Sequence, residues 1–170
     1  MAYQRILTIQ DISCVGQCSL TVALPILSAC GLETAILPSA VLSTHTAGFS
    51  GYTFRDLTDD IPNIAAHWKK EGILFNAFYT GYLGSTQQIE YVKQIMNTLG
   101  EKNSIKIVDP AMADNGTLYP AFDQAFVEKM KTLCYAADII LPNITEACLI
   151  TDTVYPETYE ENFIQGLLEK

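Results

Sequence analysis

The chain has 170 residues, of which 49% are hydrophobic and 17% charged, and this composition is typical of a globular domain rather than a disordered segment. Acidic residues outnumber basic ones by 19 to 10, which gives a net charge of −9. This balance argues against proteins that hold nucleic acid or an anionic membrane surface. We therefore expect one domain over residues 1–170, with small molecules as its partners.

Three features of the sequence bear on where the protein works. No stretch approaches the roughly 18 consecutive apolar residues of a membrane-spanning helix. Residues 1–12 contain one Arg followed by strand-like alternation, where a signal peptide would carry a basic stretch and a long apolar run. The five cysteines are odd in number and lie in apolar segments, as reduced core cysteines do. We expect a soluble cytoplasmic protein with free cysteines in its core.

The first half of the chain alternates between predicted strands and helices. Its predicted elements are a strand at 5–10, a helix at 18–30, a strand at 34–38, a helix at about 60–71 and a strand at 74–80. Gly31 is a suitable end for the first helix, because glycine accepts a positive φ there. The polar segment 43–52 has neither a helical nor a strand period, and we interpret it as a loop or flap.

The second half continues the alternation. It predicts a helix at 85–99, a strand at 105–108, a helix at 120–134, a strand at 138–141, a helix beginning at 143 and a last helix from about 159. Ser85 with Gln88, and Thr158 with Glu161, have the spacing of capping boxes. The last helix is still in progress at Lys170, so we expect the chain to stop inside a larger fold. The order of elements predicts a three-layer α/β/α fold with a mostly parallel sheet covered on both faces.

Polar side chains follow most of the predicted strands. The polar clusters are residues 10–16, 43–50, 80–85, 109–116 and 142–146. Ligands of open parallel sheets bind beyond the carboxyl ends of the strands, so we expect these five clusters to gather around one site.

Four of these side chains offer hard oxygen ligands suited to Mg²⁺ and a bound nucleotide: Asp109, Asp114, Asn143 and Glu146. Asn143 with Glu146 also has the spacing of a helix capping box, which needs no ligand to explain it, and both interpretations stay open. The segment that begins at Asp114 contains Asn-Gly, a favoured turn dipeptide, so a turn explains it better than a ligand does. Asp109 has no comparable structural explanation.

Several common catalytic motifs are missing. The sequence contains no G-x-S-x-G nucleophile elbow, no P-loop and no dinucleotide-binding G-x-G-x-x-G after the first strand. This excludes hydrolases of that type, P-loop enzymes and dinucleotide-dependent enzymes. His45 lies in the flap candidate, and we interpret it as a functional residue, with a hydrogen bond that orders the loop as the alternative.

Taken together, five segments resemble the pyridoxal/pyridoxamine kinases of the ribokinase-like superfamily. These segments are QDISCVG at 10–16, STHT at 43–46, TGYLG at 80–84, DPAM at 109–112 and LPNITE at 141–146. The resemblance covers nearly the whole chain in the family's order. His45-Thr46 and Gly81-Tyr82 separate these kinases from sugar kinases better than the Asp-Pro pair does.

The resemblance implies an ATP- and Mg²⁺-dependent enzyme that phosphorylates the 5′ hydroxymethyl group of a vitamin B6 vitamer. It also implies a cytosolic homodimer. By similarity, Asp11, Thr46 and Tyr82 would line the pyridine pocket, with His45 beside it.

On the nucleotide side, the resemblance implies that Asp109, Asp114, Asn143 and Glu146 organise Mg²⁺ and the phosphates, with Asp109 and Glu146 nearest the metal. Phosphoryl transfer needs positioning and charge neutralisation more than covalent help, and carboxylates that hold Mg²⁺ at strand ends can provide both.

Two departures from the family affect these expectations. Asp11 stands where many pyridoxal kinases have Ser, so hydroxymethylpyrimidine kinases remain the alternative. The family's Gly-rich anion hole with its catalytic Asp has no counterpart, because no Gly-x-Gly-Asp segment occurs. Losing a general base costs about 10²- to 10⁴-fold in rate, so we expect this chain to be nearly inactive alone. The alternative of another class is a non-catalytic fragment that binds a ligand or another chain.

Overall fold

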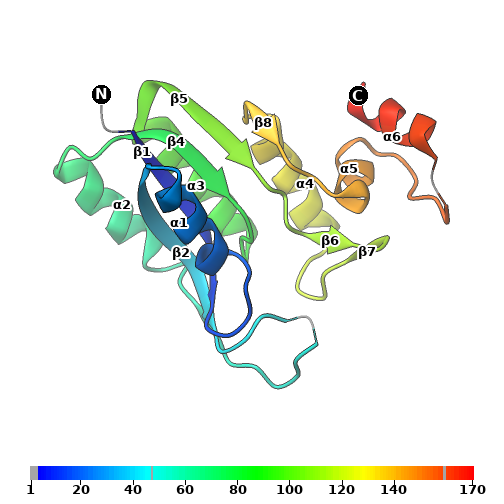
Figure 1. Ribbon diagram of the computed structural model, residues 1–170, viewed down its shortest axis with the longest axis horizontal. Coiled ribbons are helices and arrows are strands. Elements are labelled where there is room, and N and C mark those ends of the chain that lie inside the picture. Colours follow the sequence, from blue (N-terminus) through cyan, green and yellow to red (C-terminus); the bar gives the residue numbers. More distant parts are fainter. Residues whose placement is uncertain (1–3, 47, 159) are drawn as a thin grey trace.

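The computed structural model describes residues 4–46, 48–158 and 160–170, in which strands and helices alternate along the chain (Figure 1). The strands are β1 (Arg5–Ser13), β2 (Glu33–Leu42), β3 (Phe54–Asp56), β4 (Phe75–Thr80), β5 (Gly100–Val108), β6 (Ala113–Asp114), β7 (Thr117–Leu118) and β8 (Ile139–Ile140). The helices are α1 (Leu20–Ala29), α2 (Ile61–Lys70), α3 (Thr86–Thr98), α4 (Gln124–Cys134), α5 (Ile144–Ile150) and α6 (Glu161–Leu168).

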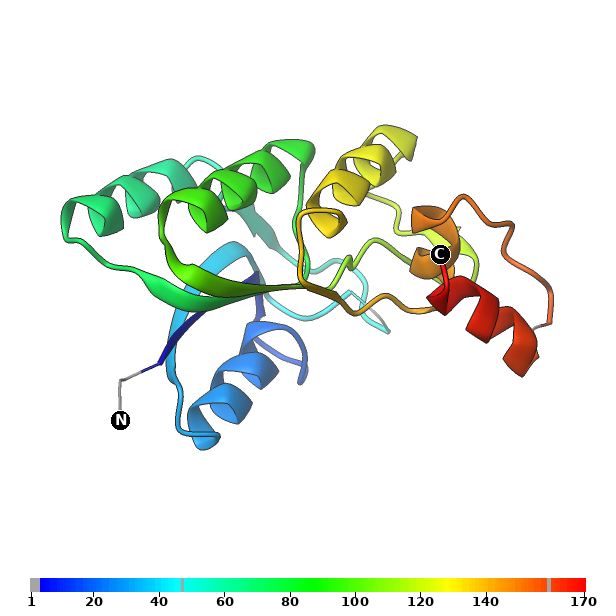
Figure 2. The same ribbon diagram turned by 90° about the horizontal axis from the view of Figure 1, so that it is seen from above.

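Six of the strands form one sheet in the order β3-β2-β1-β4-β5-β8. Every neighbouring pair is parallel except β2 and β3, which are antiparallel. Figure 2 shows α2, α3 and α4 on one face of the sheet and α1 on the other. This arrangement confirms the predicted three-layer α/β fold with a mostly parallel sheet.

The main core lies between the sheet and the layer of α2, α3 and α4. Phe75 and Phe78 of β4 are fully buried, with ring centroids 5.8 Å apart, and the Trp68 ring of α2 lies 5.5 Å from that of Phe75. Ile89 and Val92, three residues apart on α3, bury their side chains on the same face of the helix. Burial of these large apolar side chains is the main contribution that holds the two layers together.

The other face of the sheet is covered less completely. α1 packs against β1 and β2. Ile105, two residues from Ile107 on the same face of β5, is 49% exposed, and Ile139, which pairs with Ile107 in register, is 47% exposed. The prediction of cover on both faces therefore holds over β1 and β2, whereas apolar side chains of β5 and β8 are open to solvent.

Several predicted boundaries differ from the structure. β1 continues through a register shift between Gln10 and Ile12, so Asp11 lies in the strand instead of in a following loop. α4 begins at Gln124 rather than at 120, because the Asp123 carboxylate accepts a hydrogen bond from the Phe126 amide and fixes the helix start there.

The predicted capping boxes have mixed outcomes. Ser85 Oγ accepts a bond from the Gln88 amide, but Gln88 Oε1 accepts from the Gly84 amide, so only half of that box forms. The Thr158 box is wrong, since α6 begins at Glu161 after an N-cap, Glu160, that makes no side-chain cap bond. Residue 159, the predicted helix start, lies outside the described residues. The helix ends at Leu168 and does not continue to the last residue.

The cysteines are all free, as predicted, but only Cys134 and Cys148 are buried. Cys14 and Cys30 are exposed and Cys18 is half-buried, so their assignment to the core is wrong. Among the described residues, no helix is both long enough and apolar enough to cross a membrane.

Candidate functional site

The carboxyl ends of the central strands meet at one edge of the sheet. Main-chain hydrogen bonds continue past the strands, from the Gly81 amide to the Ile9 carbonyl (3.0 Å) and from the Asp109 amide to the Thr80 carbonyl (3.1 Å). A further bond of 2.9 Å joins the Leu141 amide to the carbonyl at the end of β5. These bonds place the polar segments after β1, β4, β5 and β8 next to one another in sheet order.

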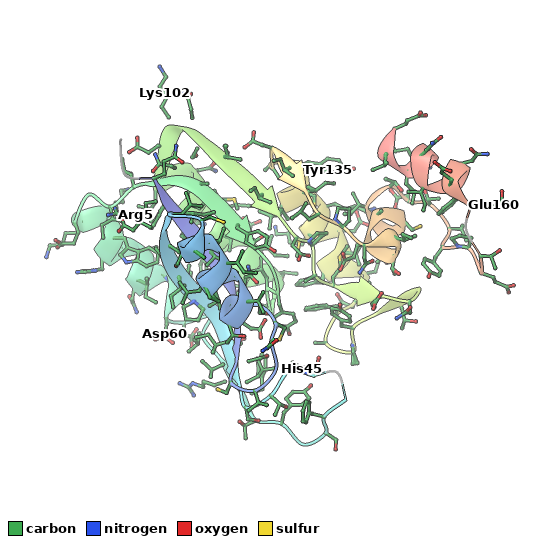
Figure 3. All side chains as sticks on the ribbon, viewed as in Figure 1. Arg5, His45, Asp60, Lys102, Tyr135 and Glu160 are labelled. Atoms are coloured by element: carbon green, nitrogen blue, oxygen red, sulfur yellow. The ribbon has the colours of Figure 1, made fainter. Side chains whose placement is uncertain are left out.

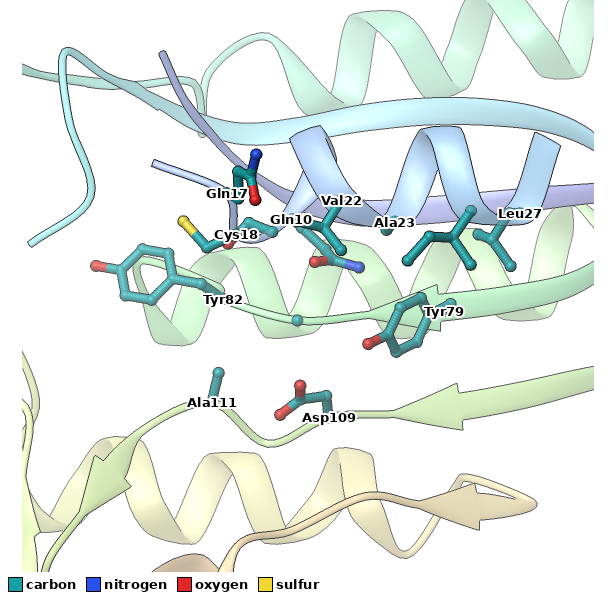
Figure 4. A pocket seen from close by; sticks show the side chains of 13 residues that line it. Gln10, Gln17, Cys18, Val22, Ala23, Leu27, Tyr79, Tyr82, Asp109 and Ala111 are labelled. Carbon is teal, nitrogen blue, oxygen red and sulfur yellow. The ribbon is translucent and has the colours of Figure 1, made fainter. Parts of the chain in front are cut away.

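A cavity of about 370 Å³ opens at this edge, between α1 and the ends of β1, β4 and β5 (Figure 4). Its lining consists of Gln10, Gln17, Cys18, Ser19, Val22, Ala23, Ile26, Leu27, Tyr79, Gly81, Tyr82, Asp109 and Ala111. The wall on α1 is mostly apolar, whereas the strand ends contribute a carboxamide, two phenols and a carboxyl group. Tyr82 and Asp109 are the predicted site residues that line it.

Asp109 is half-buried at the floor of the cavity, where Figure 4 shows its carboxyl group near the Tyr79 ring. Burial raises the pKa of Asp109 to about 6, although a hydrogen bond from the Ala111 amide partly opposes this. Burial, and then the charge of Asp109, raises the pKa of Tyr79 above its ordinary value. A carboxyl group with a pKa shifted in this way, inside a cavity, is a candidate functional group.

Tyr82 lies at the mouth of the cavity, close to two carboxylates. Burial, then Asp11, and then Tyr52 and Asp56 raise the pKa of Tyr82 to about 12. Its phenol therefore stays protonated and can donate a hydrogen bond to a ligand. Asp11 is 5% exposed and accepts a hydrogen bond from the Ser13 hydroxyl at 3.0 Å, but it does not line the cavity.

Gln88 fixes the loop that carries Tyr82. Its side chain is fully buried, and its Oε1 accepts a bond from the Gly84 amide at 2.7 Å. Its Nε2 donates to the Ser39 carbonyl at 3.0 Å and to the Thr58 hydroxyl at 2.8 Å. The Ser39 hydroxyl in turn donates to the Tyr82 carbonyl at 2.8 Å. The loop that carries Tyr82 is thus held by direct hydrogen bonds with Ser39 of β2 and Gln88 of α3, and Gln88 is itself held by Thr58.

His45 and Thr46 lie in the flap, beyond the carboxyl end of β2 (Figure 3). The His45 amide donates to the Val15 carbonyl at 3.0 Å, and its ring meets the Phe49 ring edge-on with centroids 5.1 Å apart. Thr46 is exposed. Neither residue lines the cavity, so the structure places them in the neighbouring flap rather than in the pocket with Tyr82.

Glu146 and Asn143 form a complete capping box at the start of α5, as one of the two interpretations predicted. Glu146 is 2% exposed, and its Oε1 accepts bonds from the amides of Met112 (3.0 Å) and Ala113 (3.4 Å). Its Oε2 accepts a bond from the Asn143 amide at 2.9 Å. Burial, aided by the charge of Asp109, raises the pKa of Glu146 despite these bonds. Glu146 therefore ties the loop after β5 to α5.

Asp114 is exposed at the end of β6, directly before the turn to β7, and its carboxylate accepts a bond from the Asn115 amide at 2.8 Å. Asn115 and Gly116 both have positive φ, of 50° and 75°. This geometry suits the Asn-Gly sequence and confirms the turn that was predicted here.

A metal site built from protein side chains alone is absent from the described ranges, where no three His, Cys, Asp or Glu side chains group suitably. Of the four predicted oxygen ligands, Asp109 faces the cavity, while Asp114, Asn143 and Glu146 bond to nearby main chain. Mg²⁺ keeps several waters and often uses one or two carboxylates together with substrate phosphates. The residues present therefore fit a hydrated Mg²⁺ held through Asp109.

Sequence reasoning missed part of the cavity. Tyr79 points into it because it alternates with the buried Phe78 along β4, which is a signal that a strand period could have provided. Cys18 was assigned to the core, and its place in the cavity depends on how α1 packs on the sheet.

Comparisons with known proteins agree with this fold. The family model described as phosphomethylpyrimidine kinase matches residues 30–166. A crystal structure from Bacteroides thetaiotaomicron, named as a phosphomethylpyrimidine kinase, is 40% identical with a TM-score of 0.93, over 99% of this chain and 58% of that one. An orthorhombic form with pyridoxal is 41% identical with a TM-score of 0.92, over 98% of this chain and 58% of that one.

Pyridoxal kinase from Lactobacillus plantarum is 37% identical with a TM-score of 0.89, over 98% of this chain and 59% of that one. None of the curated protein sequences matches the chain. The chain spans about 58% of the length of the solved Bacteroides relatives. These similarities, over nearly all of its residues, show that the chain belongs to the phosphomethylpyrimidine kinase family of the ribokinase-like superfamily.

Proposed function

We propose that this chain forms the substrate-binding portion of a kinase that transfers the γ-phosphate of ATP to the 5′ hydroxymethyl group of pyridoxal, pyridoxamine or pyridoxine. The main observation in support of this proposal is the cavity at the sheet edge, which has an apolar wall on α1 and the polar groups of Tyr82 and Asp109 opposite it. The crystal form of the Bacteroides relative with pyridoxal supports this substrate class. A hydroxymethylpyrimidine kinase is the second candidate, favoured by Asp11 and by the description of the matching family.

On the substrate side, the protonated phenol of Tyr82 donates a hydrogen bond to a polar substituent of the ring. Asp11 lies near enough to Tyr82 to raise its pKa, although it does not line the cavity itself. Thr46 contacts the ring from the neighbouring flap, with His45 beside it.

On the nucleotide side, Asp109 binds Mg²⁺, with Glu146, Asn143 and Asp114 shaping the loop after β5 around the phosphates. The metal neutralises charge on the transferred phosphoryl group when it is bound. Glu146 contributes by holding the amides of that loop in place. The enzyme works as a cytoplasmic homodimer.

The 170 residues contain no Gly-x-Gly-Asp segment that would supply an anion hole and a base for the acceptor hydroxyl. We therefore expect the chain to bind a vitamer with modest affinity and not to turn it over. A chain that binds neither vitamer nor nucleotide would instead be a non-catalytic interaction fragment.

The test is a calorimetric titration of the purified chain with pyridoxal, with hydroxymethylpyrimidine, and with Mg²⁺ and ATP, each separately. Tyr82→Phe should weaken binding of the preferred ring and leave nucleotide binding unchanged, whereas Asp109→Asn should do the reverse. Equal loss of both affinities in both variants would contradict the division of the site. Phosphorylation by the chain alone at about 1 to 100 s⁻¹, which is typical of kinases, would contradict the expectation of an inactive chain.

A further inference from the structure

The loop between β1 and α1 contacts both the end of β2 and the start of the flap. The amide of Cys14 donates to the Leu42 carbonyl at 2.9 Å, and the His45 amide donates to the Val15 carbonyl at 3.0 Å. At the base of the flap, the Thr53 amide donates to the Ser43 hydroxyl at 2.9 Å. The first two bonds hold the loop after β1 against the end of β2 and the start of the flap. The third bond joins the two ends of the flap to each other.

Gly16 lies directly beneath the ring of His45. A Cβ atom on Gly16 would overlap His45 Cδ2, and it would lie 3.0 Å from Cγ and 3.1 Å from Nε2. Real Cβ atoms essentially never approach a neighbour that closely, so the ring occupies space that any side chain at this position would need. The φ of Gly16 is +113°, which also favours glycine.

Gly48 and Gly51 of the flap provide a contrast. Both have positive φ, of +80° and +69°, but a Cβ atom on either would have nothing within 4 Å. At these two positions, only the positive φ of the backbone favours glycine. At Gly16, the missing side chain additionally makes room for the imidazole ring.

We infer that Gly16 is a positioning residue, whose lack of a side chain seats the imidazole of His45 and thereby fixes His45 beside the substrate pocket. The ring rests on the Gly16 backbone on one side and meets the Phe49 ring at its edge on another. A displaced ring therefore moves His45, one of the residues assigned to the substrate. This inference rests on the proposed function for its consequence in binding, but the seat itself is independent of any ligand.

The first experiment measures amide hydrogen exchange at position 45, whose N–H bonds to the Val15 carbonyl. Gly16→Ala should speed exchange by at least about tenfold, because a displaced ring loses its contacts with Gly16 and Phe49 and no longer helps to hold this part of the flap against the loop after β1. Gly48→Ala is the matched control and should change this exchange by less than about twofold. Unchanged exchange in Gly16→Ala would overturn the inference.

The second experiment separates the ring contact from backbone strain. In a His45→Ala background the ring is gone, so adding Gly16→Ala should change exchange at position 45 by less than about twofold. If Gly16→Ala speeds amide exchange at position 45 as much in the His45→Ala background as in the wild type, the effect comes from backbone strain at position 16, and the inference is overturned. If Gly16→Ala does not fold, recovery of folding in the double variant supports the seat, and failure of both refutes it.

The third experiment connects the seat to binding. Gly16→Ala should weaken binding of pyridoxal to the chain by about tenfold, whereas Gly48→Ala should leave it within about twofold. If wild-type chain binds no pyridoxal, the proposed substrate is wrong, and the exchange measurements still decide whether Gly16 seats His45. If pyridoxal binds equally to the wild type and Gly16→Ala while exchange differs, the flap does not contribute to the pocket and the positioning role is refuted.

Discussion

Removing the charge of Asp109 should make the protein more stable above about pH 6. Burial raises the pKa of Asp109 from 3.8 to about 6, so the folded state holds this proton more tightly than the unfolded chain does. A raised acid pKa makes stability fall as pH rises from about 4 to about 6, and the loss then stays constant at higher pH. Asp109→Asn removes the titration and should recover this loss.

The size of the effect follows from the shift. About two pKa units correspond to about 3 kcal/mol at 1.36 kcal/mol per unit. Asp109 is only half-buried, and solvent screening reduces this to about 1 to 2 kcal/mol. For a chain of this length, that gain raises the unfolding temperature by about 3 to 6 °C.

The assay is urea unfolding of the wild type and Asp109→Asn at pH values from about 4 to about 8. The stability difference should be near zero at the acidic end and should reach its full value above about pH 6. Asp59→Asn, at an exposed turn, serves as the control and should stay within about 0.5 kcal/mol of the wild type throughout. A difference that does not vary with pH, or a loss of stability above pH 6, would refute the reasoning.

Three further predictions concern packing and association. Glu146→Ala leaves three backbone amides without their acceptor and should destabilise the protein by about 3 to 5 kcal/mol in urea unfolding, where a loss below about 1 kcal/mol would mean that water replaces the carboxylate. Gln88→Leu should cost about 2 to 4 kcal/mol in the same assay, since it unpairs buried groups of three segments, and an unchanged midpoint would contradict this. The exposed Ile105 and Ile139 should make the chain self-associate in sedimentation experiments, and Ile139→Lys should reduce the association. A monodisperse wild-type monomer of 18.7 kDa would contradict the last prediction.

The sequence predicted those parts of the fold that have a regular apolar period. The strands around Leu7 and Phe78 and the helix around Val92 follow from such periods. β3 has three exposed residues and no apolar alternation, so nothing in the sequence indicated it. The first half of β5 is polar, and its pairing with β4 comes from the sheet rather than from local preference.

For the candidate site, the position of a residue relative to the predicted strands was a better guide to its place in the structure than its side-chain type. Asp109 follows a strand of a parallel sheet, and that alone was enough to place it at the cavity. Asp11 was expected in a loop, and its place in β1 depends on a register shift that no sequence pattern shows. The cavity residues on α1 were missed because their role depends on how far that helix lies from β4 and β5.

The order of strands also affects how the chain can fold during synthesis. After β1 and β2 pair, β4 joins beside β1, β5 beside β4, and β8 beside β5, so each new parallel strand meets a partner that has already left the ribosome. The antiparallel β3 likewise follows β2 closely in the chain. A nascent chain can therefore extend the sheet one unit at a time, with β4, β5 and β8 added in turn at one edge and β3 at the other. Each parallel pairing spans a long stretch of sequence, as in Ile6 with Ala77, so it forms more slowly than the local contact between β2 and β3.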